Sequence, residues 1–320
     1  MREPGANHDR AMKVFLTGAS GLVGAAVARA AARRGHHVVG VVGGFAGDIE
    51  GVTTRLALDL VDLAALDAAV LEAFPDVMIN CAAVSAPEAC EADPGRSQAL
   101  NVALPAALAR LAHHLHARLV HLSSEQVFDG TRTTPYAADD PPSLINLYAR
   151  QKLASERAVQ AAAGPLAVTI RAPLLMGDSL GGRRSVHERL LGDWAAGRTV
   201  KLYTDELRQP CTAENLAEVV VELGERRDLG GVFHWAGTEL LSRHALGVRV
   251  RDHFKLSAAQ APIVAVTRAE TPQAAKKRQP CLALAIAPLA GKLKTRPQSI
   301  AEQLAGLKVP PPVREWYRSL

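Results

Sequence analysis

Short apolar segments alternate with amphipathic segments over the first half of the chain. Continuous apolar runs of this length are typical of parallel strands that are covered on both faces. The predicted strands are residues 12–17, 37–42, 55–58, 76–80, 118–122 and 167–171. The predicted helices between them are residues 22–34, 63–74, 101–116 and 143–163. This alternation predicts an α/β fold with a doubly wound parallel sheet of the Rossmann type.

The alternation weakens after about Arg171, which indicates a change of domain. The later predictions are helices at residues 186–196, 213–224 and 243–255 and a strand at residues 231–235. We therefore expect a dinucleotide-binding domain over residues 12–171, which the chain re-enters near residues 200–235. Residues 172–320 should form mainly a smaller, mostly helical substrate-binding lobe. Residues 1–11 are polar and lack the apolar core of a signal peptide, so we expect a loose tail.

A glycine-rich turn follows the first predicted strand and leads into the first predicted helix. Gly18 permits a tight turn, Gly21 lets the backbone approach a pyrophosphate, and Gly24 lets the helix pack closely on the strand. The helix N-terminus adds free N–H groups and a partial positive charge. The sequence therefore predicts dinucleotide binding here. The cofactor-binding residues expected in this segment are Gly18, Ser20, Gly21, Leu22, Val23 and Gly24.

The end of the second predicted strand bears on the choice between NAD and NADP. An acidic residue there binds the adenine ribose of NAD, whereas a basic residue suits NADP. Residues 43–45 are Gly-Gly-Phe, and the missing acid favours NADP while leaving NAD open. Asp59 and Leu60, which follow the third strand, are candidates for contact with the adenine. Capping of the next helix is the alternative role for Asp59.

Three residues further along form a candidate catalytic group. Tyr148 and Lys152 are four residues apart on a predicted helix and share one face. An ammonium group beside a phenol lowers the phenol pKa, which would make Tyr148 a proton donor or acceptor near neutral pH. Ser124 follows the fifth strand, at the carboxyl edge where doubly wound sheets bind ligands. There it is positioned to hydrogen-bond a reacting oxygen.

The turn, Ser124 and the Tyr148–Lys152 pair resemble the extended short-chain dehydrogenases/reductases. Within that family, residues 75–83, 117–124, 127–130 and 152–156 are most similar to the dTDP-4-dehydrorhamnose reductases. The resemblance implies an NAD(P)H-dependent reductase that transfers a hydride to a ketone. The substrate that it favours is a 4-keto nucleotide sugar. It implies that Tyr148 is the general acid, that Lys152 tunes it and holds the nicotinamide ribose, and that Ser124 orients the substrate carbonyl.

The same resemblance extends to neighbouring residues. It implies that the adenosine and ribose side of the cofactor is lined by Cys81, Ala82, Ala83 and Val84. It places the substrate beside Ser85, Ser124, Glu125 and Gln126. Ser124 and Glu125 replace Thr and Asp of the family pattern and keep the hydroxyl and the charge, whereas two other departures remove an aromatic side chain. Gln126 stands where the family has an aromatic residue, and Leu174 stands where it has the tryptophan of the sugar pocket.

Other functions share parts of this site. An NAD-dependent sugar-nucleotide epimerase needs the same Ser-Tyr-Lys set, so it stays an alternative. A non-catalytic NADP-binding regulatory subunit, resembling that of methionine adenosyltransferase, is a second alternative. A 4,6-dehydratase is disfavoured because Gln126 lacks the carboxylate needed for its proton transfer.

Composition narrows the setting. The 320 residues are 48% hydrophobic and 22% charged, as in ordinary globular proteins. The four cysteines lack paired spacing, so we expect a cytoplasmic protein without disulfides. The net charge of +5 suits an anionic small-molecule substrate, whereas the 4% aromatic content disfavours nucleic acid. We expect no membrane contact and no metal, because His113, His114 and His116 do not converge on one helix face. The sequence is also compatible with a homodimer.

Overall fold

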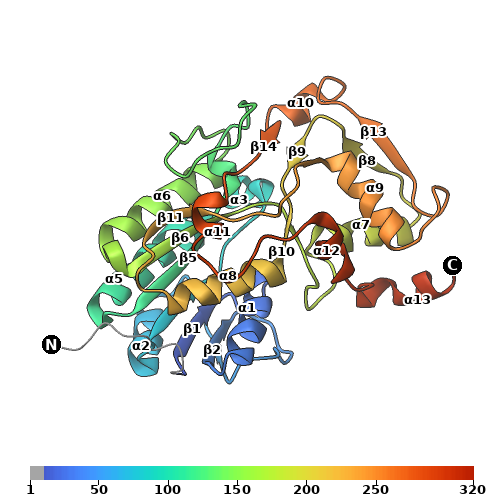
Figure 1. Ribbon diagram of the computed structural model, residues 1–320. Helices are drawn as coiled ribbons and strands as arrows, with labels where there is room; N and C mark the ends of the chain where they lie inside the picture. The colour runs from blue at the N-terminus through green and yellow to red at the C-terminus, as the bar shows by residue number, and fades with distance from the viewer. Residues whose placement is uncertain (1–10) are drawn as a thin grey trace.

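A computed structural model describes residues 11–320 (Figure 1). Its centre is a seven-stranded sheet with the order β11-β6-β5-β4-β1-β2-β3, in which every neighbouring pair is parallel. The strands are β1 (Lys13–Thr17), β2 (His37–Val42), β3 (Thr54–Ala57), β4 (Val77–Asn80), β5 (Arg118–Ser124), β6 (Ala167–Ala172) and β11 (Gly231–His234). The predicted α/β fold class is confirmed.

Helices cover both faces of this sheet. Alternate residues of each strand point to opposite faces, so Val14 and Leu16 pack with one helix layer and Phe15 with the other. The first layer consists of α1 (Leu22–Arg33) and α8 (Ala213–Glu225). The second layer consists of α2 (Leu63–Ala73), α5 (Leu104–Leu115) and α6 (Leu147–Ala163). This arrangement leaves the carboxyl edge of the sheet free for a site.

The chain returns to this domain with α8 and β11. α8 lies alongside α1 (Figure 1), and three arginines, two in α1 and one directly after it, form ion pairs with glutamates of α8. One of them, Arg34, contacts both Glu218 and Glu225, at 2.9 and 2.8 Å. β11 then pairs with β6 at the edge of the sheet. The chain thus rejoins the sheet domain through residues 213–234, whereas residues 200–212 form strands of the small sheets.

The rest of the C-terminal half forms a smaller lobe with its own apolar core around Met176, Leu191 and Trp194. Its helices are α7 (Val186–Ala195), α9 (Arg243–His253), α10 (Pro272–Ala275), α12 (Ile300–Ala305) and α13 (Arg314–Arg318). Its strands are β7 (Leu175–Met176), β8 (Val200–Tyr203), β9 (Leu207–Arg208), β10 (Cys211–Thr212), β12 (Leu241–Ser242), β13 (Ile263–Val266) and β14 (Cys281–Leu282). These strands form three small sheets. They escaped sequence prediction because two to four residues are too few to show alternation.

Several predicted boundaries need correction. β5 continues to Ser124, so this residue ends the strand rather than following it. The predicted helix 143–163 begins only at Leu147, because the Asn146 side chain accepts a hydrogen bond from Ala149 N at 2.8 Å and caps it. The predicted helix 101–116 is a π-helix over Ala99–Ala103 followed by α5. Three short helices were not predicted from the sequence. Two of them, α3 (Pro87–Ala92) and α4 (Pro94–Gln98), precede this π-helix, and the third, α11 (Ala287–Ala290), lies near β11.

Three expectations concern features outside this core. The tail at residues 1–11 lies outside the described residues except for Ala11. Over residues 11–320, no helix has the length and apolar character required to cross a bilayer. The same residues contain no group of three or more His, Cys, Asp or Glu side chains placed to hold a metal ion. His116 ends α5 in the left-handed conformation, with φ of 52°.

Candidate active site

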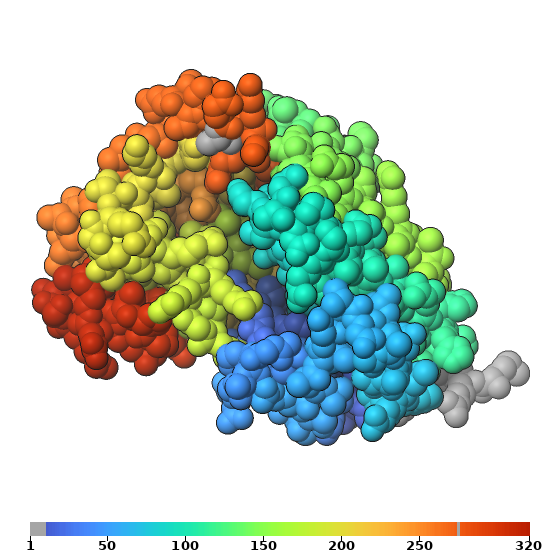
Figure 2. Space-filling model, turned by 180° about the vertical axis from the view of Figure 1, so that it is seen from behind, coloured from blue at the N-terminus to red at the C-terminus, as the bar shows by residue number. Residues whose placement is uncertain are grey.

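A cleft of about 880 Å³ lies at the carboxyl edge of the sheet, between the sheet domain and the smaller lobe. Figure 2 shows this hollow between the blue and cyan N-terminal half and the yellow and orange C-terminal segments. The ends of β4, β5 and β6 and the start of α1 form one wall. Segments 183–189, 206–208 and 277–279, with Arg243, form the other. The cleft therefore occupies the position where open α/β sheets bind ligands.

The glycine turn has the geometry that close approach requires. Gly18 has φ of +69°, and a Cβ placed on it would lie 2.8 Å from the backbone nitrogen of Ala82. A Cβ on Gly24 would lie well inside 3.0 Å of the carbonyl oxygen of Gly18. Gly21 precedes α1, whose first turn contains no acidic residue, and it lines the cleft with Leu22 and Val23. This glycine-lined helix N-terminus fits a dinucleotide pyrophosphate.

The structure divides the other predicted cofactor contacts into two groups. Cys81, Ala82 and Ala83 line the cleft beside the turn. Val84 does not line it, because its backbone is held by the Asn101 side chain through hydrogen bonds of 2.9 and 3.0 Å. Ser20 likewise lies in the turn but outside the cleft lining.

Asp59 and Leu60 do not line the cleft. Leu60 is buried in the core beneath the sheet. Asp59 accepts a hydrogen bond from Val61 N and lies 3.8 Å from a guanidinium nitrogen of Arg96. The helix cap is also a different residue, because Asp62 accepts the backbone N–H groups at the start of α2. The capping role expected for Asp59 is therefore wrong.

The three candidate catalytic residues meet in the cleft. Ser124, Tyr148 and Lys152 all line it and are buried. Lys152 Nζ donates a hydrogen bond of 2.5 Å to the carbonyl oxygen of Leu122. Burial lowers the pKa of Lys152 to about 8, although the nearby Glu156 carboxylate acts to raise it.

The pKa of Tyr148 differs from expectation. Burial raises it to about 12 and outweighs the opposing effect of a hydrogen bond with Ser124. This direction is opposite to the lowering expected from Lys152. The reason is that burial penalises the phenolate, while the lysine ammonium is engaged by the carbonyl of Leu122. In this state Tyr148 is therefore a protonated phenol, the form that a proton donor needs.

Buried polar contacts hold this group in place. Glu156 lies one helical turn beyond Lys152 and accepts hydrogen bonds from Ser123 Oγ and from the Arg171 guanidinium, the latter at 2.8 and 2.9 Å. On the neighbouring strand, Asn80 Oδ1 accepts from Thr17 Oγ1 at 2.7 Å. These contacts join β1 to β4 and join β5 and β6 to α6, so the cleft wall is preorganised.

The predicted substrate residues Ser85, Ser124, Glu125 and Gln126 all line the cleft. Burial raises the pKa of the Glu125 carboxyl to about 7, even though Arg208 and Arg243 act to lower it. Its Oε1 lies 3.5 Å from Arg208 Nε, and its buried Oε2 has no hydrogen-bond partner within the described chain. Leu174 lines the same wall, so both departures from the family pattern face the cleft.

Arginines of the smaller lobe complete the cleft, and sequence reasoning did not place them there. Glu206 accepts hydrogen bonds of 2.6 and 2.9 Å from Arg278 and pairs with Arg208 at 3.1 Å. Arg243 has a buried Nη1 without a hydrogen-bond partner in residues 11–320, and burial lowers its pKa to about 10. The only signals in the sequence were the basic doublet at residues 183–184 and the basic run at residues 276–278.

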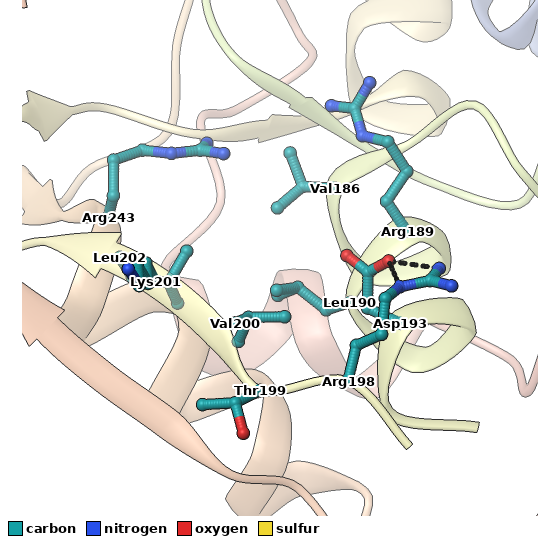
Figure 3. A pocket seen from close by; sticks show the side chains of 10 residues that line it. All are labelled: Val186, Arg189, Leu190, Asp193, Arg198, Thr199, Val200, Lys201, Leu202 and Arg243. Carbon is teal, nitrogen blue, oxygen red and sulfur yellow. Dashed lines mark hydrogen bonds and ion pairs between the residues drawn. The ribbon is translucent and has the colours of Figure 1, made fainter. Parts of the chain in front are cut away.

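A second cavity of about 340 Å³ adjoins the cleft (Figure 3). Arg189 and Arg243 line both cavities. Apolar side chains of α7 and β8, among them Leu190 and Val200, form part of the other walls, together with Thr199 and Lys201. Asp193 lies at one side, paired with Arg198 at 2.6 Å. The cleft beside Ser124, Tyr148 and Lys152 therefore continues, past Arg189 and Arg243, into a partly apolar recess.

The fold and the cleft define an NAD(P)-dependent oxidoreductase of the extended short-chain dehydrogenase/reductase type. A family model described as the RmlD substrate binding domain matches residues 12–305, and the chain belongs to that family.

Three curated relatives illustrate the range of this family. Methionine adenosyltransferase 2 subunit beta of Xenopus laevis is 32% identical over 250 residues, which cover 76% of this chain and 72% of the relative. The dTDP-4-dehydrorhamnose reductase of Mycolicibacterium smegmatis is 32% identical over 251 residues, covering 76% and 71%. The probable low-salt glycan biosynthesis reductase Agl14 of Haloferax volcanii is 30% identical over 306 residues, covering 93% and 97%.

Solved structures agree with these relatives. A hypothetical dTDP-4-dehydrorhamnose reductase from Sulfolobus tokodaii is 26% identical, with a TM-score of 0.78 over 93% of this chain and 100% of the other. The dTDP-4-dehydrorhamnose reductase of Bacillus anthracis, solved in complex with NADP, has a TM-score of 0.77 over 92% and 98%. At 19% identity this second likeness shows the fold alone.

Proposed function

We propose that this protein reduces the ketone of a 4-keto nucleotide sugar with NADPH. The observation that carries the proposal is the meeting of Ser124, Tyr148 and Lys152 in one cleft with the glycine turn. Glycan-related reductases among the relatives support a sugar nucleotide as the substrate class. NADPH is proposed over NADH because residues 43–45 offer no acid to the adenine ribose.

Each residue of the site would act through the chemistry of its side chain. A bound nicotinamide supplies the hydride that attacks the ketone carbon. Tyr148 donates its proton to the ketone oxygen as negative charge develops there. Ser124 orients that oxygen by a hydrogen bond. Lys152, in its charged form, holds the cofactor ribose and favours proton release from the phenol when the phenolate forms.

The far end of the substrate is proposed to lie past Arg189 and Arg243. The two arginines stand between the cleft and the adjoining recess, and guanidinium groups suit a diphosphate because they bind it in a bidentate fashion. The apolar surfaces of Leu190 and Val200 then suit the flat face of a base. This order of groups matches a nucleotide diphosphate joined to a sugar.

The test follows NADPH oxidation by the full-length protein with dTDP-linked 4-keto sugars and with ketones that carry no nucleotide. We expect turnover only with the nucleotide sugar. We expect Tyr148→Phe and Lys152→Ala to lower kcat by a factor of about 10² to 10⁴, the range typical of general acid–base catalysis. Absence of oxidation with every ketone, or unchanged rates in both variants, would overturn the proposal.

The Xenopus relative supports a second candidate, a regulatory subunit that binds NADP without turnover. The two candidates separate in a single experiment. A regulatory subunit binds NADPH but does not oxidise it, whichever keto sugar is added. It changes the kinetics of a methionine adenosyltransferase when the two proteins are mixed. A reductase oxidises NADPH when its substrate is added, and it needs no partner protein to do so. An epimerase interconverts sugar nucleotides without net consumption of NADPH.

A further inference from the structure

An arginine-bearing segment of the smaller lobe reaches the glycine turn. Residues 177–185 connect β7 to α7, and their two arginines line the same cleft as Gly21. The nearest side-chain atom to a Cβ placed on Gly21 is Arg184 Nη1, at 4.0 Å. In Figure 2 the yellow-green segment that follows β7 extends across the hollow towards the blue N-terminal region. A cation from one lobe therefore stands beside the helix N-terminus of the other.

The backbone of this segment is held rigidly by one buried carboxylate. Glu188 accepts hydrogen bonds from Ser179 N and Ser179 Oγ, each at 2.7 Å. Its Oε2 also accepts from the backbone nitrogens of Arg184 and Ser185, at 2.7 and 2.9 Å. Gly182, with φ of +64°, completes the bend against the proline segment 310–312. The side chain of Arg184 is thus presented from a fixed point rather than from a loose loop.

Arg184 forms no ion pair with any of the residues that the structure describes. Among residues 11–320, neither Arg183 nor Arg184 directs its guanidinium to an acidic side chain, and both side chains are exposed. The arginines at the end of α1 behave differently, since Arg33 and the C-cap residue Arg34 pair with glutamates of α8. An unpaired guanidinium facing a helix N-terminus creates a doubly positive environment, which an anion would relieve.

We propose that Arg184 binds the pyrophosphate of the dinucleotide held at the Gly18–Gly24 turn. The inference rests on the proposed function, which assigns this turn to a nicotinamide dinucleotide. The turn contributes backbone N–H groups from one side, and Arg184 contributes a guanidinium from the opposite side of the cleft. Because the arginine belongs to the smaller lobe, cofactor binding joins the two lobes and helps to close the cleft. Arg184 is a positioning residue for the cofactor and takes no part in proton transfer.

The experiment measures Kd for NADPH and NADH by nicotinamide fluorescence and Kd for dTDP by titration calorimetry, using the full chain without substrate. Arg184→Met removes the charge while keeping most of the side-chain stem. Arg184→Lys keeps the charge without the planar fork. Arg110→Met is the matched control, because Arg110 is an exposed arginine of α5 outside the cleft lining. Thermal midpoints of all four proteins confirm that folding is retained.

We expect Arg184→Met to raise the Kd for NADPH and the Kd for NADH roughly tenfold, because one hydrogen bond to a charged group contributes on this scale. Arg184→Lys should lie between this variant and the wild type, and Arg110→Met should match the wild type. The ratio between the Kd of Arg184→Met and the Kd of the wild type should become smaller at about 0.5 M salt, because salt screens exposed charges. A purely structural role for Arg184 would not produce this salt dependence.

Three results would overturn the inference while leaving the proposed function intact. The first is unchanged affinity for both dinucleotides in Arg184→Met. The second is a loss confined to NADPH, which would place Arg184 at the 2′-phosphate. The third is a loss of dTDP binding without a loss of NADPH binding, which would assign the arginine to the substrate diphosphate. If the wild-type protein binds neither dinucleotide, the proposed function itself fails.

Discussion

Substitution of Gly24 by alanine tests the close contact between α1 and the Gly18–Gly24 turn. In an unconstrained helix this change stabilises the protein by about 1 kcal/mol, because alanine loses less backbone entropy than glycine. Here the new Cβ would collide with the carbonyl oxygen of Gly18, a backbone atom held in the turn. Overpacking of this kind costs about 3 kcal/mol at the upper end of its usual range. We therefore expect Gly24→Ala to lower the free energy of unfolding by about 2 kcal/mol.

Gly192→Ala is the matched control. Gly192 also lies inside a helix, α7, but a Cβ placed there meets nothing within 4 Å. We expect this variant to gain about 1 kcal/mol of stability. Urea denaturation followed by circular dichroism measures both changes, and NADPH titration measures whether Gly24→Ala also weakens cofactor binding. Equal stabilisation of both variants would refute the close packing of α1 on the turn, and with it the structural reason for the third glycine.

Two further predictions concern buried titratable groups. Burial lowers the pKa of Lys152 from 10.5 to about 8, which corresponds to a cost of about 3 kcal/mol for the charged form. The folded protein binds fewer protons than the unfolded chain between these pKa values, so stability rises with pH there. Lys152→Met should therefore be inactive yet more stable at pH 7 by up to about 3 kcal/mol, with little gain near pH 10.5; a variant less stable at both pH values would contradict this. For Glu125, whose pKa is raised to about 7, the carboxyl is charged above that pH and repels an anionic substrate. The KM for the nucleotide sugar should fall as the pH drops through 7, and Glu125→Gln should remove this dependence; a KM profile identical in wild type and variant would count against it.

Patterns local in the sequence predicted the sheet domain well. The apolar runs located β1 to β6 within a few residues, because a buried parallel strand must be apolar along its length. The glycine spacing predicted a turn that only glycine fits, and Gly18 and Gly24 show this directly. The four-residue spacing of Tyr148 and Lys152 placed both on one helix face, and both side chains line the cleft.

Other features depended on contacts between distant segments. The sequence indicated that Tyr148 would have a lowered pKa, but burial in the folded protein raises it. Asp59 followed a strand at a plausible position, yet the chain turns so that it lies outside the cleft lining. Burial is a property of the whole packed molecule, and no spacing along the chain reports it.

The cleft as a whole shows the same division. The sequence by itself determined the parallel sheet, the glycine turn and the Ser124, Tyr148 and Lys152 set, because each depends on local spacing or on the periodicity of one element. Only the tertiary structure decided that Arg184, Arg208 and Arg243 face that set across one cleft. These arginines come from separate segments, and their positions depend on the packing of the smaller lobe against the sheet. The physical reason is that charge complementarity acts through space, so the residues that create it need no pattern in the sequence.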